Sequence, residues 1–264
     1  MVRLLVLLVG SVAVCACGRA EPEMTRVEAR PAAPTRSLAP GAHRLGLGRS
    51  AVPGFPSGRD GTLFVPTRAR SGPPLPLLVL LHGGGGRADY FDFTFPLAEE
   101  AGVVILTLDA RDNTWDGIDS PFGPDVRFID EALRHTFARV AINASRVGLG
   151  GVSDGGSYSL SLGLTNGDLF THLVAVAPGF INAPGPAVGR PRIYVAHGTR
   201  DNVYSVTSTR RYLVPQLRTA GYEVTYEEFD GPHRMMPATV GKVFAWLKEA
   251  GGQPAPALSE AASR

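Results

Sequence analysis

Cysteine is scarce in this chain of 264 residues: both copies, Cys15 and Cys17, lie in the first 17 positions. The rest of the chain therefore offers no disulfide and no thiol for catalysis or zinc binding. Charge of one sign is not in excess either, because 26 basic residues stand against 24 acidic ones. With no basic stripe interleaved with aromatic residues, nucleic acid is not an expected partner. The apolar run from Leu4 to Val14 falls short of the about 20 residues that span a bilayer.

The first 17 residues have the pattern of an export signal. Arg3 supplies a positive charge ahead of the apolar run, as in secretory signal peptides. Residues 14–18, Val-Cys-Ala-Cys-Gly, resemble a bacterial lipobox, which implies cleavage before Cys17 and lipidation of that residue. A plain secretory signal cut nearby is the alternative, because Cys15 is unusual inside a lipobox. Either reading predicts export from a bacterial cell, as a membrane-anchored lipoprotein or as a periplasmic or secreted protein.

Composition divides the remaining chain into three parts. Residues 18–43 are rich in Ala, Pro, Arg and Glu, cannot build a core, and are predicted to form a disordered tether. Residues 44–250 are predicted to form one domain, because the chain is 44% hydrophobic and can bury a large core. Residues 251–264 are rich in Ala, Pro and Ser and are predicted to be a flexible tail.

Short apolar runs alternate with helical patterns through the predicted domain. Residues 77–81, Leu-Leu-Val-Leu-Leu, are typical of a strand buried on both faces of a parallel sheet. We expect Asp125 to cap a helix through Phe137. The alternation predicts an α/β fold: a doubly wound, mostly parallel sheet with antiparallel N-terminal strands. The other predicted strands are 44–47, 61–65, 103–108, 146–149, 172–176, 192–196 and 223–229, and the other helices 87–101, 157–164, 206–219 and 237–249.

A nucleophile-elbow pattern occurs at residues 151–155, Gly-Val-Ser-Asp-Gly. It requires one serine on a turn so sharp that only glycine tolerates the crowding on either side. The match alone is weak, because 32 of the 264 residues are glycine. The predicted strand 146–149 and helix 157–164 supply the strand–turn–helix context that the motif needs. Ser153 is therefore the candidate nucleophile.

A run of four glycines follows the predicted strand 77–81, at residues 82–86, His-Gly-Gly-Gly-Gly. Ligands of open parallel sheets bind at the carboxyl ends of the strands. Backbone amides of such a loop can stabilise the oxyanion of acyl transfer, with the amide of Asp154 as a second donor. A phosphate-binding loop is the rival interpretation, but the Gly-Lys-Ser/Thr ending is missing. His82 is expected to be a packing or hydrogen-bonding residue rather than the base.

Two further polar groups follow strands of the predicted sheet. Asp201 lies in residues 197–201, His-Gly-Thr-Arg-Asp, and His233 in residues 230–233, Asp-Gly-Pro-His. A serine hydroxyl needs a base to become a nucleophile, and that base needs a partner to fix its tautomer. The order serine, acid, histidine matches the α/β-hydrolase arrangement. Asp230 is the alternative acid. The residues expected to have structural roles are Asp168, His43, His135 and His172.

These four motifs resemble those of α/β-hydrolase serine esterases, in particular the phospholipase/carboxylesterase group and the feruloyl-esterase and polyhydroxybutyrate-depolymerase-like enzymes, over about residues 59–249. The resemblance implies hydrolysis of carboxylic esters through an acyl-Ser153 intermediate, with no metal or cofactor. It also implies Gly84 as the first oxyanion donor and Asp154 as the second. The glycine run replaces the family's more varied residues, so Gly83 and Gly85 stay open as alternatives.

Only 48 positions separate Ser153 from Asp201, and the predicted elements nearly fill them. We therefore expect no cap domain and an open site, suited to small soluble esters or to the end of a polymer. Trp115, in the loop 109–124, is either a pocket wall or a buried core residue. The alternatives are a peptidase of the prolyl-oligopeptidase type and an inactive binding module on a hydrolase scaffold. The expected partner is a small-molecule or polymer ester, with membrane contact only through a lipid anchor.

Overall fold

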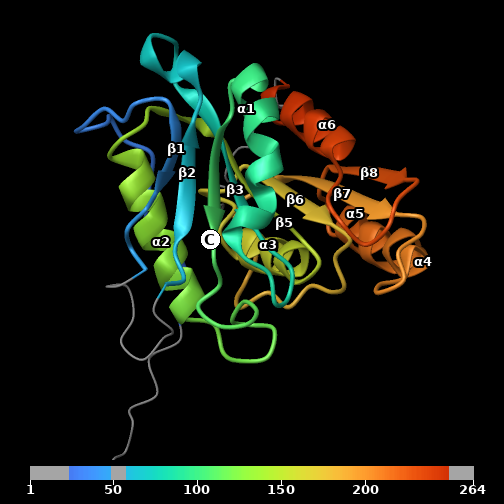
Figure 1. Cartoon of the computed structure of the whole chain (residues 1–264). Helices are drawn as coiled ribbons and strands as arrows, with labels where there is room; N and C mark the ends of the chain where they lie inside the picture. Colours follow the sequence, from blue (N-terminus) through green and yellow to red (C-terminus); the bar gives the residue numbers. More distant parts are fainter. Residues whose placement is uncertain (1–23, 49–57, 250–264) are drawn as a thin grey trace, which may run out of the picture.

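A computed structural model describes residues 24–48 and 58–249. They form one eight-stranded sheet with helices on both faces (Figure 1), and its strand order is β1-β2-β4-β3-β5-β6-β7-β8. The strands are β1 (Gly41–Arg44), β2 (Gly61–Val65), β3 (Leu75–Leu81), β4 (Val104–Leu108), β5 (Ile142–Val152), β6 (His172–Val176), β7 (Arg192–Gly198) and β8 (Val224–Phe229). The helices are η1 (Thr67–Arg70), η2 (Ala88–Thr94), α1 (Phe95–Ala101), α2 (Pro124–Phe137), α3 (Asp154–Thr165), α4 (Val206–Ser208), η3 (Thr209–Leu213), α5 (Val214–Thr219) and α6 (Pro237–Lys248).

Strand direction follows the predicted fold class. β2 pairs antiparallel with β1 and with β4, and the pairings from β4 through β8 are parallel. The predicted α/β fold with antiparallel N-terminal strands is therefore confirmed. In the described chain, α3, β6, β7 and their loops fill the stretch between Ser153 and Asp201, so no cap domain interrupts it.

Strand β3 shows why this sequence folds into three layers. All seven of its residues are buried. Leu77 and Val79 pack into the core shared with α2, α3 and α5. Leu78 and Leu80 pack into the core shared with η2, α1 and α6. Because alternate residues of a strand face opposite sides, a strand covered on both faces needs a continuous apolar run.

The N-terminus of α2 is not capped by Asp125. The N-cap residue is Gly123, with no side-chain capping bond. Asp116 supplies the acceptor instead, because its Oδ2 accepts from the amides of Gly123 at 2.9 Å and Asp125 at 2.7 Å. The Asp125 carboxylate turns back to the loop, where it accepts from the Arg111 amide at 2.6 Å and the Asp116 amide at 2.7 Å. Burial, followed by the charge of Asp116, raises the pKa of Asp125 to about 7.

Two other predicted helices differ in detail. The stretch predicted at 87–101 divides into the 3₁₀ turns of η2 and the α-helix α1. The stretch predicted at 206–219 is one continuous helical segment, but its middle, η3, is π-helical. A π turn widens the helix by one residue and is frequent at functional sites.

The predicted tether is wrong for residues 24–43. Val27 and Ala29 are each only 1% exposed. The amide of Val27 donates to Asn166 Oδ1 at 2.8 Å, and that of Ala29 donates to Asp130 Oδ1 at 2.6 Å. Small buried side chains and satisfied backbone groups therefore dock this segment, with Met24 and Leu38 packed half-buried against the core.

The predicted position of the first strand is also wrong. The strand spans Gly41–Arg44 and pairs with β2, rather than lying at 44–47 as predicted. The signal peptide, Cys17 and the tail 251–264 lie outside the described residues. Within the described ranges, no helix is long and apolar enough to cross a membrane.

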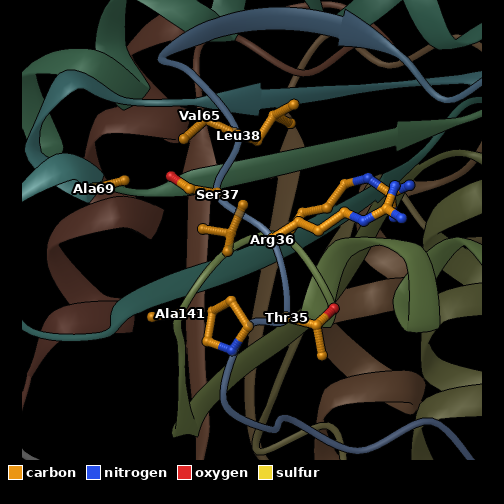
Figure 2. Close-up of a pocket in the computed structure, with 10 residues that line it drawn as sticks. Thr35, Arg36, Ser37, Leu38, Val65, Ala69 and Ala141 are labelled. Atoms are coloured by element: carbon orange, nitrogen blue, oxygen red, sulfur yellow. The ribbon is translucent and has the colours of Figure 1, made fainter.

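The docked segment also lines a hollow of about 310 Å³. Figure 2 shows Ser37 and Leu38 beside Val65, with Ala141 across from them. The Leu75 amide, at the first residue of β3, donates to Ala141 O at 3.0 Å. This hollow therefore lies at the amino-terminal edge of the parallel strands, opposite the edge that carries the predicted site.

Candidate active site

Ser153 lies between β5 and α3 with φ 57° and ψ −123°. Positive φ is uncommon for a residue with a side chain and costs about 1–3 kcal/mol. The surroundings enforce it: the Ser153 amide donates to Val176 O at 2.9 Å. A Cβ on Gly151 would lie 2.5 Å from Leu81 O, and one on Gly155 would collide with the same oxygen. The two glycines let the turn pack against β3, and the serine is left at its tip.

Asp201 and His233 are brought together from different parts of the sequence. His233 Nδ1 lies 2.6 Å from Asp201 Oδ2. The other carboxylate oxygen accepts from the amides of Val203 at 2.8 Å and Tyr204 at 2.9 Å. Burial alone would raise the pKa of Asp201, but the hydrogen bonds from His233 and these amides outweigh burial and lower it. Asp201 is therefore an anion that can fix the His233 tautomer.

A second imidazole, His197, contacts the same carboxylate. Its Nε2 lies 3.0 Å from Asp201 Oδ2 and 3.2 Å from the Tyr204 carbonyl oxygen. Its Nδ1 lies 2.9 Å from Thr209 Oγ1, in the π turn. The side chain is fully buried, and burial lowers the pKa of His197 despite these partners. A neutral His197 thus contacts Oδ2 of Asp201, the oxygen that also contacts His233, and leaves Oδ1 to the two backbone amides.

The glycine loop passes directly over the nucleophile. A Cβ on Gly83 would lie 3.1 Å from Ser153 Cβ, and one on Gly84 would lie 2.6 Å from Asp154 Oδ2. The Gly85 amide is already bonded to Asn113 O at 2.8 Å, which removes Gly85 from the candidate donors. Gly83 and Gly84 stay open. Asp154 is the first residue of α3, so its amide is one of those without an intrahelical acceptor.

His82 and Trp115 support this loop from below. Nε2 of His82 accepts from the Ala110 amide at 3.0 Å, and Nδ1 lies 2.7 Å from Gly83 O. Trp115 Nε1 donates to His82 O at 2.8 Å. Both side chains are fully buried. Trp115 is therefore a core residue, and its interpretation as a pocket wall is wrong.

Tyr204 connects His233 to Asp154, the residue after Ser153. Its ring lies edge-on to that of His233, with centroids 5.5 Å apart. Its hydroxyl lies 3.4 Å from Asp154 Oδ1, while Thr114 Oγ1 donates to Asp154 Oδ2 at 2.7 Å. Sequence reasoning missed both Tyr204 and His197. The adjacency of His197 to Asp201 in one motif was the only local signal for either.

Ser153 and His233 are not hydrogen-bonded to each other in this structure. Among the described residues, buried Nε2 of His233 has no hydrogen-bond partner. Such bonds are often long in a free enzyme and tighten when substrate binds.

The alternative carboxylates lie elsewhere. Asp230 is 82% exposed and pairs with Arg200 at 2.9 Å. Asp168 pairs with Arg26 and Arg30 of the docked segment at 2.8 and 2.6 Å. Within the described ranges, no three His, Cys, Asp or Glu side chains gather into a metal-binding group.

No protein-family model matches the chain, and no curated protein does. Solved structures do, and the likeness shows the fold: the chain has the α/β-hydrolase fold. One is a substrate-bound fluorophosphonate-binding serine hydrolase, FphF of Staphylococcus aureus, with TM-score 0.60 and 15% identity over 80% of this chain and 100% of that one. Another is the CE1 ferulic acid esterase AmCE1/Fae1A of Anaeromyces mucronatus, with TM-score 0.60 and 16% identity over 84% and 98%. A third is the acylaminoacyl peptidase of Pyrococcus horikoshii, with TM-score 0.56 and 18% identity over 81% and 41%. Their different activities mean that the site, rather than the fold, must carry the functional argument.

Proposed function

We propose that the chain is a serine hydrolase that cleaves carboxylic esters through an acyl-Ser153 intermediate. The observation that carries the proposal is the 2.6 Å contact between Asp201 and His233, at the sheet edge where Ser153 occupies a positive-φ turn. The similarity of the fold to serine hydrolases and esterases supports the same class of reaction.

Each residue has a defined task in the acylation step. Ser153 Oγ attacks the ester carbonyl carbon, and its proton passes to His233 Nε2. Asp201 stabilises the resulting imidazolium through Nδ1. Amides of the glycine loop, with Gly84 as the leading candidate, and of Asp154 bind the oxyanion that forms on the carbonyl oxygen. His233 then returns the proton to the leaving alcohol oxygen as the C–O bond breaks.

Deacylation repeats the sequence with water. A water molecule gives a proton to His233 Nε2 and attacks the acyl carbon. The tetrahedral intermediate collapses, the ester bond to Ser153 breaks, and the serine oxygen takes the proton back from His233. The products are a carboxylic acid and the free enzyme. No step needs a metal or a redox cofactor.

Turnover of p-nitrophenyl acetate by the purified chain tests the proposal. Ser153→Ala should lower kcat by about 10⁶-fold and abolish labelling by a fluorophosphonate, because both need the serine oxygen. Ser145→Ala is the matched control, since Ser145 is an exposed serine near the start of β5, the strand that ends just before Ser153, and its Oγ donates to Asn143 Oδ1. Activity that survives Ser153→Ala would refute the assignment.

A peptidase is the second candidate, favoured by the structural similarity to an acylaminoacyl peptidase. This chain covers only 41% of that protein. Comparing N-acetyl-alanine methyl ester with N-acetyl-alanine p-nitroanilide separates the two, because a peptidase cleaves both and an esterase cleaves the ester selectively. An inactive binding module would take no fluorophosphonate label at Ser153.

We also propose export from a bacterial cell with a lipid on Cys17. The support is the sequence pattern around that residue. Mass spectrometry of the mature N-terminus tests it: a diacylglyceryl-modified Cys17 is expected. An unmodified terminus downstream of Cys17 would refute lipidation and favour a plain secretory signal.

A further inference from the structure

A pocket of about 370 Å³ lies beside the candidate catalytic residues. One wall is the loop that follows β6, at residues 178–181. The other wall is the helical segment α4–η3–α5, from its N-cap Ser205 to Gln216 in α5. The volume falls within the about 300–1,000 Å³ of small-molecule pockets.

Tyr204 is shared between this pocket and the catalytic residues. It lines the pocket, and its ring also packs on His233. A Cβ on Gly179, in the opposite wall, would lie 2.7 Å from the Tyr204 ring, so the two walls meet at this tyrosine. The Gly179 amide donates to Ser157 Oγ at 2.9 Å, which ties the loop to the helix behind Ser153. The pocket therefore adjoins the candidate catalytic residues, with Tyr204 between them.

The backbone is irregular in both walls. In the described ranges, only Ser153 and Ala177 combine a side chain other than glycine's with positive φ. Ala177 has φ 48° and immediately precedes the loop wall. Strained conformations of this kind persist where the fold over-determines them and concentrate at functional sites. The opposite wall contains the π turn η3, whose Thr209 both lines the pocket and contacts His197.

The lining is uncharged and half apolar. Phe180, Ile181 and Leu213 supply apolar surface, and Ser208 and Gln216 supply hydrogen-bonding groups. Among the described residues, no Asp, Glu, Lys, Arg or His lines the pocket. A charged group would lose hydration there and gain no ionic partner, which is costly.

The mouth of the pocket presents an exposed aromatic ring. Tyr212 is 70% exposed, and Val203, two residues beyond Asp201, is 60% exposed. They are the two exposed large hydrophobic residues of the described chain. Ser208, Tyr212 and Gln216 are spaced four residues apart, which places them along one side of the helical segment.

We propose that this pocket binds the alcohol-derived part of the ester, and that it takes an uncharged, ring-bearing group. The proposal rests on the esterase function proposed above. The general acid His233 must face the leaving alcohol oxygen, and Tyr204 joins the pocket to His233. The acyl part then lies toward the glycine loop. Esters of phosphate-bearing alcohols, such as lysophospholipids, do not match this neutral lining.

The first test compares two isomers with the ring on opposite sides of the ester, benzyl acetate and methyl phenylacetate. Tyr212→Ala should lower the ratio of kcat/KM for benzyl acetate to that for methyl phenylacetate by about fivefold, because the stacking surface is lost. Tyr212→Phe should keep the ratio. Thr207→Ala, an exposed neighbour outside the lining, is the control. A ratio that rises or stays constant in Tyr212→Ala overturns the assignment of the pocket to the alcohol.

The second test places a charge in the pocket. Acetylcholine and 3,3-dimethylbutyl acetate have the same shape and differ in one positive charge on the alcohol. Gln216→Glu should raise the kcat/KM ratio of the cationic to the neutral ester by roughly threefold, and Gln216→Lys should lower it. Thr207→Glu adds the same charge outside the pocket. Equal shifts in Gln216→Glu and Thr207→Glu would overturn the proposal.

Fluorophosphonate labelling separates the two levels of failure. If the wild-type protein takes no label at Ser153 and hydrolyses no ester, the proposed function itself fails. If the wild-type protein is labelled and active but the kcat/KM ratios do not change when Tyr212 or Gln216 is substituted, only the pocket assignment fails.

Discussion

His172 offers a quantitative test of the packing between β6 and α6. Its side chain is 3% exposed, and its ring meets Trp246 edge-on at 4.9 Å. Nδ1 lies 2.8 Å from Thr171 Oγ1, whereas Nε2 is among the buried atoms without a partner in the described residues. Burial, followed by the charges of Arg192 and Arg146, lowers the pKa of His172 from 6.5 to about 4. The native state therefore holds this imidazole neutral where the unfolded chain would protonate it.

The sign and size of the effect follow from proton linkage. Between pH 4 and pH 6.5 the unfolded state binds more protons at His172, so stability rises with pH across this window and is lost as pH falls. A histidine pKa that moves from 6.5 to about 4 corresponds to about 3 kcal/mol of unfolding free energy at the acid end. His172→Phe keeps a ring against Trp246 and removes the titration.

Urea denaturation followed by circular dichroism at pH 4.5, 5.5 and 7.5 measures this difference. At pH 7.5 both side chains are neutral, so that point isolates the packing change. Relative to pH 7.5, His172→Phe should gain about 2.5 kcal/mol over the wild type by pH 4.5. Parallel stability curves for the two proteins would show that His172 is not held neutral, and would refute the reasoning.

Three further outcomes are expected. Asp201→Asn should lower kcat for p-nitrophenyl acetate by about 10⁴-fold with little change in KM; a loss confined to KM would contradict its role toward His233. Asp130→Ala should destabilise the fold by about 2 kcal/mol in urea denaturation, because it strands the amides of Glu28 and Ala29. Asp168→Ala, which removes only exposed ion pairs, should cost less than about 1 kcal/mol, and an equal cost for both would contradict this account. Excess EDTA should leave ester hydrolysis unchanged, and a loss restored by added zinc would contradict a metal-independent mechanism.

The central sheet could be predicted from the sequence because its signal is local. A parallel strand covered on both faces must be apolar throughout, and residues 77–81 have that pattern. The docked N-terminal segment carries no such signal. Val27 and Ala29 are small, and their partners Asn166 and Asp130 lie more than 100 positions away. A segment held by distant polar groups has the composition of a tether.

The same distinction applies to the site. Ser153 lies in a motif whose glycines are required by local steric crowding. The sequence motif therefore identifies Ser153. Asp125 looked like a cap because it opens a helix, yet Asp116, nine positions earlier, accepts the amide bonds. Tyr204 acquires its position only when β7, β8 and the loop after β6 come together. Contacts that depend on three separate elements produce no motif of fixed spacing that could be recognised in the sequence.

The docked segment shortens the stretch of chain between Cys17 and the folded domain. The Met24 amide bonds to Phe122 O at 3.3 Å, beside the start of α2, at the sheet edge that also carries Ser153. If Cys17 bears a lipid, only residues 18–23 separate the two, and six residues reach at most about 20 Å. A tether over residues 18–43 would have reached about 90 Å. With the proposed lipid on Cys17, Met24 and the neighbouring sheet edge that carries Ser153 would therefore be held close to the bilayer surface.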